Sequence, residues 1–286
     1  MQKTFISISV FLSLAISGFS LSKKDSNLFY AINYQSISAV RKLIQNGANV
    51  NVKDKDGWTP LKQAIYRKRY KVVKLLIYNR ANVNTKDRGS GSTPLHDATY
   101  QRQYYITKFL LSKGAKVNFR NYNGQTPLHL AVFKRSYRIT KLLISKGAKV
   151  NVKNYFNGYT PLQTAAENGK YQIVKLLLSH GAKINENYNY KRFTPLHGAV
   201  FKGYYHIAKL LIYRGANINA KERIGRTPLH IASFMKNYKI AKLLISRGAK
   251  VNEKDKYGMT PLDIANNKKI KILLIKHGGR SGRAVK

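Results

Sequence analysis

The chain has 286 residues, of which 53 are Lys or Arg and only 11 are Asp or Glu, so its formal net charge is +42 at pH 7. This excess predicts attraction to polyanions such as nucleic acid, acidic proteins or an anionic surface. The absence of cysteine excludes disulfide bonds, thiolate catalysis and thiolate metal sites, while a hydrophobic content of 43% suffices for a packed interior.

The first 22 residues differ from the rest of the chain. Lys3 is their only charged side chain, and the apolar stretch 5–16 is followed by small residues up to Ser22. This is the order of a secretory signal peptide, whereas a membrane span needs about 20 apolar residues. We expect cleavage after Ser20 or Ser22 and a secreted or periplasmic protein. The alternative is an apolar N-terminus that stays uncleaved.

One triplet, Thr-Pro-Leu, recurs along the chain at intervals of 33 or 34 residues. A period of this length indicates a stack of similar supersecondary units that bury their apolar faces against one another, not a globule around one core. Such stacks present extended binding surfaces, so the period favours binding over catalysis. The triplets begin at Thr59, Thr93, Thr126, Thr160, Thr194, Thr227 and Thr260.

The unit that begins at Thr126 shows how each repeat is expected to fold. Threonine can accept a hydrogen bond at a helix N-cap and proline is tolerated at the first helical position, so the triplet opens a helix. A second helix follows, and Gly147 can adopt the left-handed conformation that ends it. The remaining residues form an extended hairpin. The apolar residues at helical spacing are Leu128, Ala131 and Val132 in the first helix and Ile139, Leu142, Leu143 and Ile144 in the second.

Two motifs carry a resemblance to the ankyrin-repeat family, and it covers the chain from about Ser26 to Gly278. The resemblance implies a mainly α fold, an ankyrin-repeat solenoid of about eight helix-turn-helix units with β-hairpin loops. It also implies a non-enzymatic scaffold that binds proteins without a cofactor, and we expect a monomer. Thr-Pro-Leu-His stands at 93–96, 126–129, 194–197 and 227–230, and Gly-Ala-x-Val/Ile-Asn at 47–51, 114–118, 147–151, 181–185, 215–219 and 248–252.

The terminal units depart from the pattern, as capping repeats should. The first lacks Thr-Pro and the last is shorter than its neighbour. Arg80 replaces the glycine that ends the second helix elsewhere, and a left-handed non-glycine residue costs about 1 kcal/mol, which predicts a weak point between the second and third units. The predicted segments are a signal peptide (1–22), an N-terminal capping repeat (23–57), six central repeats (58–259), a truncated C-terminal capping repeat (260–279) and a basic disordered tail (280–286).

The recurring histidines are the first candidates for chemistry. Stacked helices lie about 8–10 Å apart, whereas zinc–nitrogen bonds are about 2 Å long, so one histidine per repeat cannot form a metal site. The resemblance implies a structural histidine that forms hydrogen bonds within its repeat. The sequence also lacks a phosphate-binding loop, a metalloprotease motif and a serine elbow, so we predict no enzyme and no metal. The histidines are His96, His129, His197 and His230.

Aromatic residues recur at two positions of the repeat. One column is expected to pack between repeats: Tyr70, Tyr104, Tyr137, Tyr171, Tyr204 and Tyr238. The other stands at the end of the first helix, where the resemblance implies a variable position facing a concave groove, and the hairpin tips are also aromatic. We predict that groove and tips bind a partner, although stacking between neighbouring repeats is the alternative. The candidates are Tyr66, Tyr100, Phe119, Tyr122, Phe133, Tyr155, Phe156, Tyr159, Tyr188, Tyr190, Phe193, Phe201 and Phe234.

A column of lysines supports a second hypothesis. The resemblance places the second helix on the outer side of the stack, so these residues would form a basic back surface. Biased composition explains them equally well. The first hypothesis therefore predicts an acidic protein partner in the groove, and the alternative predicts nucleic acid or an anionic surface on the back. The column comprises Lys74, Lys108, Lys141, Lys175, Lys209 and Lys242.

Overall fold

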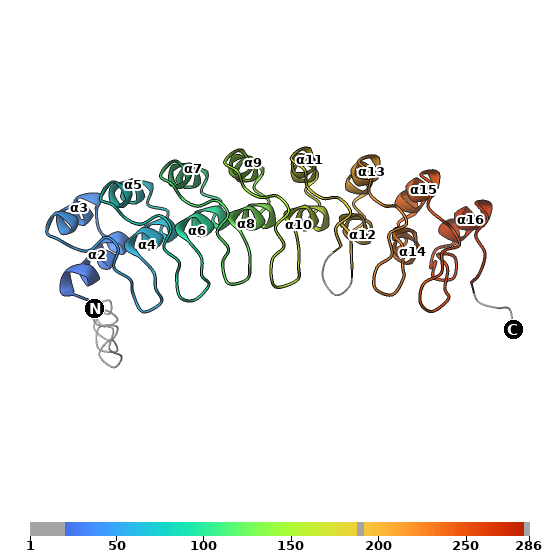
Figure 1. Ribbon diagram of the computed structural model, residues 1–286, viewed down its shortest axis with the longest axis horizontal. Coiled ribbons are helices and arrows are strands. Elements are labelled where there is room, and N and C mark those ends of the chain that lie inside the picture. Colours follow the sequence, from blue (N-terminus) through green and yellow to red (C-terminus); the bar gives the residue numbers. More distant parts are fainter. Residues whose placement is uncertain (1–20, 188–191, 283–286) are drawn as a thin grey trace, which may run out of the picture. The chain divides into compact units, whose positions relative to one another are not determined.

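The computed structural model of the protein describes residues 21–187 and 192–282. Helices of two kinds alternate along the chain, which we call inner and outer (Figure 1). The inner helices are α2 (Lys23–Tyr34), α4 (Pro60–Tyr66), α6 (Pro94–Tyr100), α8 (Pro127–Phe133), α10 (Pro161–Glu167), α12 (Pro195–Phe201) and α14 (Pro228–Phe234). The outer helices are α3 (Ile37–Gln45), α5 (Tyr70–Tyr78), α7 (Tyr104–Ser112), α9 (Tyr137–Ser145), α11 (Tyr171–Ser179), α13 (Tyr205–Tyr213), α15 (Tyr238–Ser246) and α16 (Lys268–Lys276).

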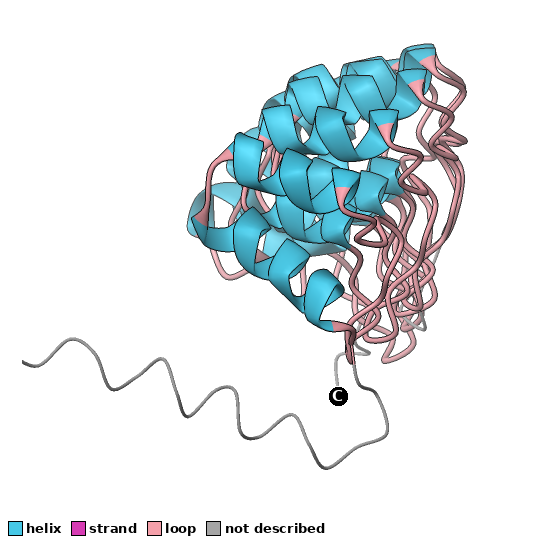
Figure 2. Ribbon diagram, turned by 90° about the vertical axis from the view of Figure 1, so that its left-hand side faces the viewer, coloured by secondary structure: helices cyan, strands magenta, loops and turns pink. Residues whose placement is uncertain are grey.

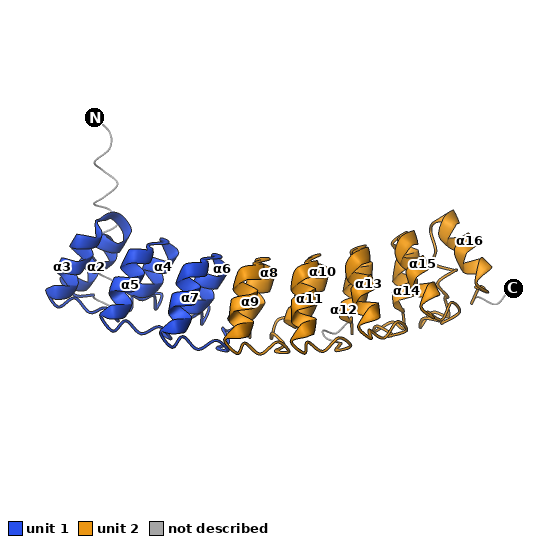
Figure 3. Cartoon of the chain, turned by 90° about the horizontal axis from the view of Figure 1, so that it is seen from above, with its two compact units in different colours: residues 1–122 blue, residues 123–286 orange. Residues whose placement is uncertain are grey.

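The chain divides into two compact units, residues 1–122 and 123–286 (Figure 3). Within each unit, an inner helix packs against the next inner helix and against the outer helix that follows it. The long loops project from the inner layer on the side away from the outer helices (Figure 1). Each unit therefore has three layers, and the repeat period predicted this helix-turn-helix architecture.

The Thr-Pro-Leu triplet opens the inner helices as predicted. Thr160 is the N-cap of α10, and its hydroxyl accepts a hydrogen bond from the Gln163 amide, while the Gln163 side chain accepts one from the Thr160 amide. In α8 the imidazole replaces that amide side chain: Nδ1 of His129 accepts from the Thr126 amide at 3.2 Å. Reciprocal bonds of this kind satisfy two backbone donors that the first helical turn leaves free.

The core lies between the two helical layers and between neighbouring repeats. Leu61, Leu95, Leu128, Leu196 and Leu229 of the triplets are completely buried. Burying a leucine contributes about 1.5–3 kcal/mol, and the same position is filled once per repeat, so the stack gains this term at every step.

The asparagine that closes each repeat bonds to the next repeat. Nδ2 of Asn151 donates to the carbonyl of Gly181, and its Oδ1 accepts from the Lys183 amide at 2.9 Å. Asn185 makes the same pair of bonds to Gly215 and Asn217. One side chain thereby satisfies backbone groups exposed where an outer helix ends.

The expected β-hairpins are turns and loops in the residues that the structure describes, where no strand forms (Figure 2). One or two backbone bonds close a tip, such as the bond between the Asn154 amide and the Tyr159 carbonyl. Another links successive tips, as between the Tyr155 amide and the Asn123 carbonyl. A ladder needs consecutive paired residues, and here side chains such as Asn154, which accepts from two tip amides, replace the further backbone bonds.

The last repeat differs from the prediction in two ways. Residues 261–264 form turns, not an inner helix, so this repeat contributes only α16. The Asp263 carboxylate accepts from the amides of Thr260 and Gly282 and from the Ser281 hydroxyl. The chain is consequently held in place as far as Gly282, beyond the predicted start of the tail at Arg280, while residues 283–286 lie outside the described part.

One assignment in the tyrosine column was wrong by one residue. Tyr70, Tyr104, Tyr137, Tyr171 and Tyr238 each begin an outer helix, but in α13 that place belongs to Tyr205. Tyr204 is the N-cap, and its ring lies against Gly169, where an added Cβ would come within 2.8 Å of it. Two adjacent tyrosines allowed both registers, and the distance from Thr194 to the helix start selects the second.

Arg80 has the backbone strain that the sequence predicts. Its φ is +65°, while the equivalent Gly114 has φ +83° and open space around its Cα. The asparagine bond is retained, since Nδ2 of Asn51 donates to the Arg80 carbonyl. The arginine therefore takes the helix-ending conformation at a steric cost that glycine avoids.

Arg80→Gly is expected to stabilise the first unit by about 1 kcal/mol, because the left-handed conformation no longer opposes a Cβ. Denaturant unfolding followed by circular dichroism measures the change. Gly114→Arg is the matched control, with an expected loss of about 1 kcal/mol because only the backbone conformation opposes it. Equal stability of both variants and the parent would contradict the assignment of strain.

Among the residues that the structure describes, no helix is both long enough and apolar enough to cross a membrane. The predicted signal peptide falls almost wholly on residues 1–20, which are outside the described part. Ser22 is described, and it is the N-cap of α2: its hydroxyl accepts a hydrogen bond from the Asp25 amide at 3.2 Å.

Candidate functional site

The ends of the inner helices and the adjoining loop tips form the surface that the sequence analysis selected, which we call the groove surface. Five inner helices end in aromatic residues that are between 42% and 54% exposed, so the core does not require these rings. The rings lie at the same position of their helices, and in the second unit Glu167 of α10 takes this position between two of them. They are Tyr66 and Tyr100 in the first unit and Phe133, Phe201 and Phe234 in the second.

The tips of the first unit combine exposure with packing. The Tyr122 ring is 60% exposed, yet it lies on Gly91, where an added Cβ would come within 2.6 Å of the ring. Phe119 is half-buried beneath two ammonium groups, with Nζ of Lys86 at 5.4 Å and Nζ of Lys116 at 5.2 Å from its centroid. These rings therefore stabilise the loops and also present cation-covered faces.

The tips of the second unit are more open. Tyr155 stacks on Gly124 as Tyr122 does on Gly91, and Phe156 is 87% exposed. The Tyr159 hydroxyl donates to Oε1 of Glu167 at 2.9 Å. Glu167 ends α10 at the position where α8 and α12 end in phenylalanine, and its carboxylate holds the Tyr159 ring in place.

Further along the second unit, Phe193 stacks on the buried imidazole of His197, with the two ring centroids 5.5 Å apart. Lys202 places its ammonium 5.6 Å from the Phe201 centroid. Tyr188 and Tyr190, two other predicted binding residues, fall outside the described residues.

Three clefts bring predicted residues of the second unit together. The first, of about 520 Å³, is lined by Phe133, Phe156, Tyr159 and Glu167. The second, of about 610 Å³, shares Phe156, Tyr159 and Glu167 with the first and is also lined by Phe193 and Phe201. The third, of about 600 Å³, lies between Phe193, Phe201 and Phe234 and includes residues that the sequence analysis did not select: Ile224, Arg223, Lys256 and Tyr257. In the first unit, Tyr66, Tyr100 and Tyr122 are exposed and Phe119 is half-buried.

The outer helices carry the lysine column. Lys108, Lys141, Lys175, Lys209 and Lys242 are exposed, and Lys74 is half-buried. None of the outer helices contains Asp or Glu, because the eleven acidic residues lie in loops, in α2 or on inner helices. Some cations lie on tyrosine rings, such as the Arg247 guanidinium 3.9 Å from the Tyr213 centroid. This back surface is uniformly basic.

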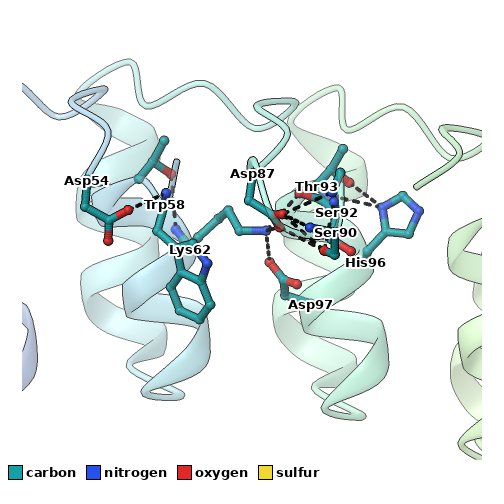
Figure 4. Close-up of polar contacts among 11 residues, drawn as sticks. Asp54, Trp58, Lys62, Asp87, Ser90, Ser92, Thr93, His96 and Asp97 are labelled. Atoms are coloured by element: carbon teal, nitrogen blue, oxygen red, sulfur yellow. Dashed lines mark hydrogen bonds and ion pairs between the residues drawn. The ribbon is translucent and has the colours of Figure 1, made fainter. Parts of the chain in front are cut away.

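One polar cluster was missed by the sequence analysis (Figure 4). Nζ of Lys62 is 2.7 Å from Asp87 Oδ2 and 2.6 Å from Asp97 Oδ2, and it donates to the Ser92 carbonyl at 2.8 Å. Only 1% of the Lys62 side chain is exposed. His129 bonds through Nε2 to the equivalent carbonyl of Tyr159, so the ammonium takes the place of that imidazole.

Burial acts on both carboxylates of this cluster, but the outcome differs between them. Burial raises the pKa of Asp97 to about 6 against the opposing effect of Lys62. The pKa of Asp87 is lowered, because hydrogen bonds from Lys62 and Ser90 and the Lys62 charge outweigh its burial. The signal was present in the sequence: Lys62 replaces histidine or glutamine, and Asp97, at the next position of the following repeat, replaces apolar or small residues such as Leu130.

The recurring histidines are structural, as predicted. His230 Nδ1 accepts from the Thr227 amide at 3.1 Å, and Nε2 lies 3.1 Å from the Met259 carbonyl. Burial lowers the pKa of His197 to about 4, so this ring is neutral at pH 7. Within the described residues, no three His, Asp or Glu side chains gather in a way that could hold a metal ion.

Comparison with known proteins agrees with the repeat geometry. A family model of three ankyrin repeats matches residues 8–87, 79–154 and 148–222, and a single-repeat model matches residues 224–256. The comparison with curated proteins gave no match.

Two solved structures are similar over most of the chain. The human ASB11 ankyrin repeat domain is 27% identical, with a TM-score of 0.69, and the match covers 78% of this chain and 99% of that one. The ankyrin repeat domain of Bcl-3, a member of the IkappaB family, is 28% identical, with a TM-score of 0.69 and coverage of 77% and 100%. The chain belongs to the ankyrin-repeat family, whose repeats mediate protein–protein interaction.

Proposed function

We propose that this protein is a non-enzymatic scaffold that binds an acidic protein through its groove surface. The observation that carries the proposal is the row of clefts in the second unit, where Lys134 and Lys202 lie beside the half-exposed rings of Phe133 and Phe201, and Arg223 and Lys256 line the third cleft. Contiguous exposed aromatic rings mark interaction sites, and aromatic and arginine side chains supply most of the binding energy at interfaces. If the protein is exported from the cell, we expect this scaffold to be an effector that acts in a host.

Replacing three rings at once tests the groove. The variant Phe133→Ala, Phe201→Ala and Tyr155→Ala is expected to weaken capture of the partner at least about tenfold, because each ring buries apolar area on binding. Affinity capture with the full chain, followed by titration of the captured partner, gives the measurement. Tyr213→Ala removes an equally exposed ring from the outer surface and is expected to leave capture unchanged. Unchanged capture by the triple variant would reject the groove.

The back surface supports the alternative of polyanion binding, and the absence of acidic residues from the outer helices favours it. Repeating the capture at two salt concentrations separates the two functions. Contact with 6–10 phosphates lowers affinity by about 10³–10⁵ between 50 and 200 mM salt. The interaction would belong to the back surface if affinity falls this steeply with salt, if Lys209→Ala and Lys242→Ala lower the affinity, and if the triple groove variant keeps it.

We further propose that the protein is exported by a signal peptide cleaved after Ser20. This cut leaves Ser22 as the N-cap of α2, a role worth about 1 kcal/mol, whereas cleavage after Ser22 removes it. N-terminal sequencing of material recovered outside the cytoplasm is expected to begin at Leu21. A mature chain that begins at Met1 would reject export by cleavage, and one that begins at Lys23 would reject the chosen site.

A further inference from the structure

The three clefts of the second unit form a regular series. The first and second share Phe156, Tyr159 and Glu167, and the second and third share Phe193 and Phe201. Each therefore lies one repeat beyond the previous one. A ligand that occupies all three must present a side chain at intervals equal to the spacing between repeats.

That spacing restricts the backbone of the ligand. Packed helices lie about 8–10 Å apart. A polyproline II chain advances about 3.1 Å per residue with three residues per turn, so every third side chain lies on one face at intervals of about 9 Å. A β-strand alternates its faces, and side chains three residues apart point in opposite directions. The repeat spacing thus matches the polyproline II period.

The charges around the third cleft restrict the ligand's side chains. Oε1 of Glu222 accepts from the amides of Ile224 and Arg226, so this carboxylate is committed to its own tip. Asp255 accepts from the Tyr257 amide and pairs with Nε of Arg226 at 3.2 Å. Both acids are thereby buried, whereas Arg223 and Lys256 are exposed at the rim.

The second cleft repeats this arrangement. The Glu167 carboxylate accepts from the Tyr159 hydroxyl, and Lys202 is exposed beside Phe201. Aromatic rings line all three clefts, and the exposed charged side chains of the second and third are positive; the first is otherwise lined mainly by uncharged polar residues, and its charged residue is Glu167. In the second and third clefts, carboxylates beside an inserted apolar side chain would meet cations, whereas ligand lysines would meet like charges.

We propose that these clefts bind an acidic partner segment in the polyproline II conformation, with an apolar side chain at every third residue. The inference rests on the proposed protein-binding function and specifies its partner. Successive apolar side chains enter the first, second and third clefts, and carboxylates between them lie against Lys202, Arg223 and Lys256. The spacing of the clefts specifies the backbone conformation of the ligand, and the cations beside the clefts specify that the ligand is acidic.

Fluorescence anisotropy with synthetic peptides tests the spacing. The probe is fluorescein-labelled Glu-Glu-Phe-Pro-Glu-Phe-Pro-Glu-Phe-Glu-Glu, in which phenylalanine recurs at every third residue. The comparator Glu-Glu-Pro-Glu-Phe-Phe-Phe-Glu-Pro-Glu-Glu has the same composition and charge without that spacing. With the full chain at about 150 mM salt, the probe is expected to bind at least about tenfold more tightly than the comparator. Equal affinities would overturn the proposal.

Two further arms locate the site and test the charge. Phe201→Ala removes a ring shared by two clefts and is expected to weaken probe binding at least about tenfold, while Tyr213→Ala on the outer surface leaves it unchanged. A probe with lysine for every glutamate is expected not to bind. Equal binding of the lysine probe, or full binding by Phe201→Ala, would also overturn the proposal.

The results distinguish failure of the proposed ligand from failure of the proposed groove function. If the two phenylalanine peptides bind equally while the triple groove variant loses its partner, the spacing is rejected and the groove function stands. If the triple variant keeps its partner, both are rejected. Circular dichroism of Phe201→Ala confirms that the variant remains folded before its affinity is compared.

Discussion

Lys62→Ala is expected to destabilise the first unit by about 3–5 kcal/mol, the largest effect of any single substitution considered for this protein. The change removes the ammonium that lies between Asp87 and Asp97 and leaves two carboxylates without their counter-charge. It also leaves the Ser92 carbonyl without its side-chain donor. Hydrogen exchange of the amides in α4 and α6, together with denaturant unfolding of the full chain, measures the loss.

A double substitution shows that the cost comes from the unpaired charges and not from loss of the lysine as such. Lys62→His with Asp97→Leu gives each position a residue type that another repeat has there: His129 is equivalent to Lys62 and bonds through its imidazole to the next repeat, and the apolar Leu130 is equivalent to Asp97. Replacing a buried ion pair by a packed alternative is often neutral or stabilising. The double variant is expected to unfold within about 1 kcal/mol of the parent. Loss as large as in Lys62→Ala would contradict this explanation.

The same comparison shows what the sequence could predict. The Thr-Pro-Leu period placed each inner helix because the N-cap, the proline and the apolar spacing all act within one turn. The closing glycines and Arg80 were placed because their conformation is local. The triplet alone did not indicate that residues 261–264 form turns, where the Asp263 carboxylate bonds to Ser281 and Gly282, close to the C-terminus.

The groove surface was predictable only in outline. The sequence identified the aromatic positions, because the repeat assigns each a place relative to its helix. It could not show that Phe193 and Phe201 share two clefts, because ring orientation in the tips depends on contacts between repeats, such as Tyr155 on Gly124. Lys62 and Asp97 were each visible as departures from the repeat, but their pairing required comparing adjacent repeats.

Acidification from about pH 7 to pH 5 is expected to act on the two units in opposite directions. In the second unit, burial lowers the pKa of His197 to about 4 and also lowers the pKa of His230. Neutral histidine is the folded form, so this stability is present above the ordinary pKa of 6.5 and is lost as the pH falls toward 4. For His197 alone the loss at pH 5 is about 2 kcal/mol.

Protonation of Asp97 has the opposite effect on stability. Its folded pKa of about 6 lies above the ordinary 3.8, so the folded state binds the proton more tightly than the unfolded state. Stability from this group is lost as the pH rises from about 4 to 6, and acidification to pH 5 restores about 1 kcal/mol to the first unit. Asp87, with its lowered pKa, weakens the fold only below about pH 4, so it does not interfere at pH 5.

Hydrogen exchange at the two pH values, corrected for the intrinsic exchange rate, resolves both effects in one chain. The parent for this comparison carries His96→Gln, because the imidazole of His96 is buried in α6 next to Asp97 and would oppose its effect. In that parent, protection is expected to rise in α6 and fall in α12 on acidification. His197→Gln supplies the control, because Gln163 performs the same capping role in α10 without titrating, and it should abolish much of the loss in α12. Asp97→Leu should abolish the gain in α6. A change of the same sign in both helices would contradict the assignment, since the buried imidazole and the buried carboxyl must respond to protons oppositely.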